Sequence, residues 1–162
     1  MPAPRFVYQT VRRRLPMQVA KYKAGRLTPL ELAKMRASLQ PDFDALCAGR
    51  ATRKQFAGVS TAVELALAIE RKGVVKGLRD ILTQAEQLLL DIKQRCDKPL
   101  GWIPPTLTPL QIEVVQELLW LHMEQLKQLS YGEYQEAWKN MMGHVTSQGG
   151  EVINGTPIHT DR

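Results

Sequence analysis

The sequence has little of what metal proteins and many enzymes are built from. Its two cysteines, Cys47 and Cys96, form no Cys-x-x-Cys pair, which argues against zinc-ribbon and dithiol redox sites. Its three histidines, His122, His144 and His159, match no metal-binding spacing, and no glycine-rich phosphate loop or Gly-x-Ser-x-Gly turn is present. We interpret His122 as a surface or boundary residue of a helix. We therefore expect no catalytic residue, no metal and no cofactor, and reduced thiols in a cytoplasmic protein.

Long apolar stretches and aromatic residues are also scarce. No apolar run approaches the roughly 20 residues that a membrane-spanning helix needs, and the N-terminus lacks the apolar core of a secretory signal peptide. The aromatic fraction is 6% and the hydrophobic fraction is 44%, with abundant Leu, Ala, Gln and Glu, which favours helices over strands. These properties predict a soluble, all-α protein with a single domain.

Acidic residues are absent from the first 27 positions. This segment holds seven basic residues, whereas residues 28–162 hold 15 basic and 16 acidic ones. The excess positive charge of the chain therefore lies in an extended N-terminal arm, residues 1–27. The basic residues of the arm are Arg5, Arg12, Arg13, Arg14, Lys21, Lys23 and Arg26.

Three interpretations of the arm remain open. Its clustered cations could displace counterions from nucleic-acid phosphates, with Tyr8 and Tyr22 stacking on bases. The same charges would suit an acidic protein or an anionic membrane surface. Alternatively, the arm is solvated and packs its apolar residues on the body. A mitochondrial transit peptide would also be rich in Arg, but Pro4 and Pro16 interrupt the amphipathic helix that such a peptide forms.

Capping motifs and apolar periodicity predict a bundle-like domain of five or six helices over residues 28–145. Residues 28–31, 108–111 and 130–133 each place a capping hydroxyl three positions before Glu or Gln. The corresponding helices run from 29 to a stop before Pro41, from 109 to 129 and from 131 to 145. We also expect a helical turn at 42–49, a core helix at 62–72 and a longer helix over 74–96. Residues 99–105 form a rigid connector, and residues 146–162 a flexible polar tail.

Residues 52–63 have the outline of a DNA-reading helix-turn-helix with Gly58 at the turn. The pattern fails this test, because Lys54 falls where a small buried residue is required and Glu64 where an apolar one is required. We interpret residues 50–54 as a basic loop. Its Arg50, Arg53 and Lys54 would add to the contacts of the arm.

One residue of the helix that begins at residue 109 departs from its amphipathic pattern. At 100° per residue, Trp120 falls on the polar side, opposite the apolar arc. The charged residues on that side are Glu113, Glu117, Glu124 and Lys127. A Trp among charges is costly unless something covers it, and the candidates are the connector with Trp102, the arm, or a partner. The glutamates alone are also explained as a solvated helix face.

Together these patterns predict a non-enzymatic binding protein. In the leading hypothesis the arm, with the basic loop, contacts nucleic acid mainly through phosphates. The alternative is an adaptor, chaperone-like factor or assembly component that binds a protein, or a second copy of itself, through Trp120 and the acidic helix face. The arm would then meet an acidic protein surface. An enzyme is the third option, but it would need an acid, a base or a metal that the sequence does not supply.

Overall fold

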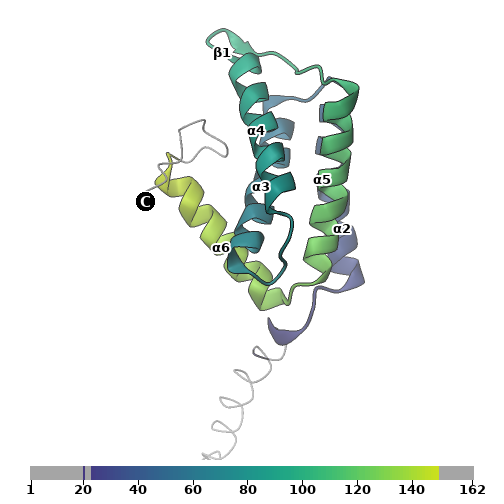
Figure 1. Ribbon diagram of the computed structural model, residues 1–162, viewed down its shortest axis with the longest axis vertical. Coiled ribbons are helices and arrows are strands. Elements are labelled where there is room, and N and C mark those ends of the chain that lie inside the picture. Colours follow the sequence, from purple (N-terminus) through teal and green to yellow (C-terminus); the bar gives the residue numbers. More distant parts are fainter. Residues whose placement is uncertain (1–19, 21–22, 150–162) are drawn as a thin grey trace, which may run out of the picture.

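The computed structural model describes residue 20 and residues 23–149 of the chain. These residues form five helices and a small hairpin: α2 (Pro29–Cys47), α3 (Arg53–Lys72), α4 (Arg79–Cys96), β1 (Asp97–Lys98), β2 (Gly101–Trp102), α5 (Pro109–Lys127) and α6 (Tyr131–Ser147). Helices α2 to α5 run alternately up and down as a bundle, while α6 packs on α3 and diverges from the bundle (Figure 1). The predicted all-α class is confirmed for this part of the chain. No helix among residues 23–149 is both long enough and apolar enough to cross a membrane.

The hydrophobic core lies between the four helices of the bundle, and each of them contributes to it. Its largest fully buried apolar side chains in the bundle are Phe43, Leu46, Ile69, Leu82, Leu89, Ile92, Leu118 and Leu126. A separate small cluster of Ala68, Met141 and Val145 attaches α6 to α3. Because α6 buries only a narrow stripe, its Trp138 remains 41% exposed.

The predicted starts of α2, α5 and α6 are confirmed, because each is closed by the capping box that the sequence indicates. At α2, the Glu31 N–H donates to Thr28 Oγ1 over 3.2 Å and the Thr28 N–H donates to Glu31 Oε2 over 2.8 Å. The same reciprocal bonds satisfy two backbone donors that a helix start otherwise leaves without partners. These starts depend only on residues three positions apart.

The predicted stop before Pro41 is wrong, since α2 continues through this proline to Cys47. Proline removes the N–H that would donate to the carbonyl of Ala37. Both Ala37 and Pro41 are exposed, so water can bond that carbonyl. The last turns of α2 bury Phe43 and Leu46 in the core, which offsets the lost backbone bond.

The predicted basic loop at 50–54 with a separate helix at 62–72 is also wrong. A fourth capping box joins Thr52 and Gln55, so α3 begins at Arg53 and runs unbroken through Gly58. A side chain at Gly58 would collide with the carboxylate of Asp42 on α2. The glycine therefore serves the close approach of two helices rather than a turn, and no helix-turn-helix exists here.

The helix predicted over 74–96 begins later, at Arg79. Residues 73–78 form a loop in which Gly73 and Gly77 have φ angles of 81° and 101°, a region that suits glycine. The Gly77 N–H donates to Glu70 Oε1 over 3.0 Å. This loop lets α4 reverse direction and return along α3.

The proline-rich connector is not helical, as predicted, and part of it is the hairpin of β1 and β2. Trp102 packs on Phe56 with ring centroids 5.1 Å apart, and its indole N–H donates to the Ala51 carbonyl over 2.8 Å. An ion pair of Arg53 with Asp97 ties the hairpin to α3. Ile103, in contrast, is 56% exposed, so of Trp102 and Ile103 only Trp102 clamps the connector to the bundle.

Candidate functional site

The outward side of α5 carries an exposed tryptophan among charged and polar side chains. Trp120 is 58% exposed, in line with its position on the helical wheel, and Lys127 pairs with Glu124 one turn apart on α5. We call this surface the Trp120 face and define it by Glu113, Gln116, Glu117, Trp120, Glu124 and Lys127. All six side chains are exposed or half-buried.

The described residues leave Trp120 largely uncovered. Trp102, one of the predicted covers, packs on Phe56 instead. Beside Trp120 lies a shallow cavity of about 200 Å³ between α2 and α5, whose α2 wall includes Arg36 and Gln40. The arm is the other predicted cover of Trp120. Its residues 1–19, 21 and 22 lie outside the described residues.

The predicted basic contacts that the structure describes fall into two groups. Lys23 and Arg26 precede α2, and Arg50, Arg53 and Lys54 follow it, so the 19 residues of α2 separate the two groups by about 28 Å. Arg53 is also engaged in its ion pair with Asp97. The remaining predicted contacts, Arg5, Arg12, Arg13, Arg14 and Lys21, lie outside the described residues.

The root of the arm is attached to the turn between α5 and α6. The Tyr131 N–H donates to the Gly25 carbonyl over 2.8 Å, and the Leu27 N–H donates to the Leu129 carbonyl over 3.4 Å. Leu27 itself is only 5% exposed. The chain therefore joins the body at residues 25–27, at the end of the bundle opposite to the hairpin.

An apolar groove of about 470 Å³ lies between α2, α3, α5 and α6, with Met35, Leu39, Leu65 and Trp138 among its lining residues and His122 in its wall. The interpretation of His122 as a surface or boundary residue is wrong, because it is 2% exposed. On the helical wheel His122 falls inside the apolar arc of α5, so the helical period itself indicates its burial.

The side chain of His122 belongs to a buried hydrogen-bond chain. Gln125 Nε2 donates to the Ala66 carbonyl over 3.0 Å, which leaves Gln125 Oε1 as the acceptor for His122 Nδ1 at 3.1 Å. Nδ1 therefore carries the proton of a neutral ring. Burial lowers the pKa of His122 to about 4, and the bond to Gln125 opposes this shift only in part. The ring is thus a fixed, uncharged part of the groove.

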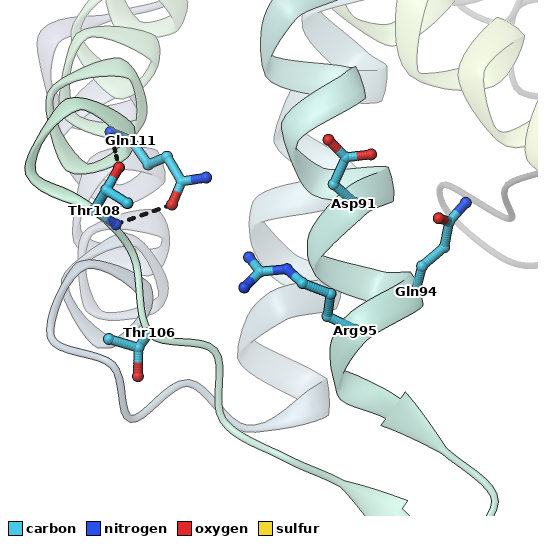
Figure 2. A pocket seen from close by; sticks show the side chains of 6 residues that line it. All are labelled: Asp91, Gln94, Arg95, Thr106, Thr108 and Gln111. Carbon is cyan, nitrogen blue, oxygen red and sulfur yellow. Dashed lines mark hydrogen bonds between the residues drawn. The ribbon is translucent and has the colours of Figure 1, made fainter.

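A polar cleft of about 420 Å³ lies between the end of α4 and the start of α5. Figure 2 shows Arg95 extending from α4 into the space before the capping box of α5, with Asp91 one turn away on α4 and Gln94 pointing away from that space. Thr108 and Gln111 bond each other's backbone N–H groups there. Thr108 and Gln111 therefore serve the helix start, and Asp91 accepts a hydrogen bond from Gln87 Nε2 on α4.

Glu64 is a buried titratable residue that the site prediction missed. It is 5% exposed on α3, within an otherwise apolar run. Burial, followed by the charge of Glu86 and a hydrogen bond with it, raises the pKa of Glu64 to about 7, while Arg71 acts in the opposite direction. None of the three cavities described above is lined by Glu64, so we interpret this carboxyl as part of the α3–α4 packing.

The surfaces described above offer an exposed indole, a mostly apolar groove and scattered cations. Among residues 23–149 no three His, Cys, Asp or Glu side chains come close enough to hold a metal ion. No protein-family model matches the chain, and neither a curated protein nor a solved structure shows significant similarity to it.

Proposed function

We propose that the protein is a non-catalytic interaction component that binds another protein surface through the Trp120 face. The observation that carries this proposal is the 58% exposure of Trp120 on a long helix that the bundle holds in place. Large aromatic side chains that become buried on association supply much of the affinity at protein interfaces. The charged residues around Trp120 have the character of an interface rim, which gives orientation and selectivity more than affinity.

The geometry also changes the order of the two binding hypotheses. The charge of the arm was the basis for placing nucleic acid first, with added contacts from Arg50, Arg53 and Lys54, but α2 lies between these three residues and the described arm residues Lys23 and Arg26. The Trp120 face, in contrast, lies within one helix. Protein contact is therefore our first proposal and nucleic-acid contact our second.

Photo-cross-linking tests the first proposal without removing the indole. A benzophenone amino acid at Glu117, an exposed member of the Trp120 face, should form a protein adduct in the native host. Trp120→Ala in the same chain should reduce the adduct at least about tenfold, because an interface anchor is lost. The matched control carries the benzophenone at Leu100, which is fully exposed on the hairpin at the far end. Equal adducts at positions 117 and 100, or no change with Trp120→Ala, would contradict the proposal.

The second candidate is nucleic-acid binding by the arm through phosphates. It is favoured by the charge distribution, since residues 1–27 hold seven basic and no acidic residues while the rest of the chain is nearly neutral. Lys23 and Arg26, the two basic residues of the arm that the structure describes, are both exposed. Binding of this kind depends on counterion release and has little sequence preference.

Fluorescence-anisotropy titrations of duplex and single-stranded DNA and RNA test the second candidate. Affinity should fall with salt, with a log–log slope no steeper than about −6 for seven contacts to duplex DNA. Replacing Arg12, Arg13 and Arg14 by Ala should weaken binding to every sequence and reduce that slope by about 3. The control replaces Lys93, Arg95 and Lys98, at the hairpin end, and should leave binding unchanged. Affinity that does not vary with salt would exclude this mode.

A further inference from the structure

Two pairs of side chains on the Trp120 face are complementary when the residue order of α5 is reversed about Trp120. Seven positions before Trp120 stands Glu113, and seven positions after it stands Lys127. Four positions before it stands Gln116, and four positions after it stands Glu124. At 1.5 Å per residue these pairs lie about 10 Å and 6 Å from the tryptophan along the axis of α5.

We propose that this face binds a second copy of the chain, with two α5 helices antiparallel and Trp120 at the two-fold axis. The inference deepens the proposed function, because it names the partner of the same face. In this arrangement each Glu113 lies opposite Lys127 of the other copy, and each Gln116 lies opposite Glu124. Both ends of the contact thus pair an acid with a base, and the next positions pair an amide donor with a carboxylate.

The parallel arrangement of the same two helices is unfavourable. It would place Glu113 opposite Glu113, Glu124 opposite Glu124 and Lys127 opposite Lys127, and like charges facing each other across an interface disfavour association. Charge order therefore selects the antiparallel pair. Such a pair is closed and self-complementary, as two-fold dimers are.

The cavity beside Trp120 offers a place for the indole of the second copy. The cavity of about 200 Å³ between α2 and α5 has Arg36, Gln40 and Gln116 in its walls, next to Trp120 itself. A tryptophan from the other copy can enter this recess instead of colliding with its counterpart. Arg36 then offers a guanidinium group to the ring, a contact that stabilises aromatic side chains. Each copy would fill the recess of the other.

The charge pairs give a sharp test by sedimentation velocity over a range of protein concentrations. The parent chain should show a reversible monomer–dimer equilibrium. Glu113→Lys and Lys127→Glu, each of which creates two like-charge contacts per dimer, should each raise the dissociation constant at least about tenfold. The double variant E113K/K127E restores opposite charges in the antiparallel pair only, and its constant should return to within about threefold of the parent.

Two further variants complete the test. Asp91→Lys makes the same charge change as Glu113→Lys at an exposed position of α4, outside the Trp120 face, so its dissociation constant should stay within about threefold of the parent. Trp120→Ala should raise it at least about tenfold. All substituted positions are exposed or half-buried, and circular dichroism verifies that each variant is folded.

Three results would overturn the inference: a parent chain that stays monomeric at high concentration, a double variant no better than the singles, or a dimer that is indifferent to Trp120. The proposed function has a separate readout. A monomeric parent chain that still gives a Trp120-dependent adduct of a different protein at position 117 would leave that function standing and reject only the second copy.

Discussion

Glu64→Gln is expected to become more stable relative to the parent chain as the pH rises, by about 3 kcal/mol between pH 4 and pH 8. The pKa of Glu64 is about 7 in the folded protein, against 4.5 as its ordinary value. The folded state therefore keeps a proton that the unfolded chain has already released. The free energy of unfolding of the parent therefore falls as the pH rises from about 4.5 through 7. Glutamine resembles the protonated carboxyl at every pH, so the variant does not lose stability in this way.

Urea unfolding at pH 4, 6 and 8 measures this difference. Glu117→Gln is the matched control, because it makes the same chemical change at an exposed position of α5, and its stability relative to the parent should vary much less with pH. If the difference between Glu64→Gln and the parent is the same at all three pH values, Glu64 is ionised in the fold without penalty, and the packing of α3 against α4 must admit water there.

His122→Asn is expected to become more stable relative to the parent chain as the pH falls. The pKa of His122 is about 4 in the folded protein, against an ordinary value of 6.5, so between these values the unfolded chain binds a proton that the folded chain refuses. The parent should therefore lose about 3 kcal/mol relative to the variant as the pH falls from 7 to 4. Asparagine keeps an N–H that can donate to Gln125 Oε1, although it leaves some space at the groove.

The same unfolding series from pH 7 to pH 4 tests this prediction. His144→Asn, at a half-buried position on α6, is the matched control and should change little relative to the parent. A constant difference between His122→Asn and the parent would mean that His122 takes up its proton in the folded state as readily as in the unfolded one. Between pH 4.5 and 6.5 the Glu64 and His122 effects have opposite signs, so they offset each other in the parent chain and only the variants separate them.

The starts of the helices could be predicted from short stretches of sequence. A hydroxyl and a Glu or Gln three positions later satisfy each other's backbone groups, so Thr28, Thr108 and Ser130 mark helix starts whatever the rest of the chain does. Thr52 follows the same rule, and applying it there would have predicted the start of α3. The polar position of Trp120 could likewise be predicted, because the helical period assigns each residue of α5 to one side.

The sequence by itself determined the all-α class, the starts of α2, α3, α5 and α6 and the charge of the arm, since these depend on residue type and near neighbours. Only the tertiary structure decided that α2 passes through Pro41 and α3 through Gly58. It also decided that Glu64 is buried and that α2 separates Arg26 from Arg50. Each of these features depends on which helices lie side by side. Burial energy and electrostatics act between residues that are distant in sequence, and they override local signals where packing gains more than a single backbone bond loses.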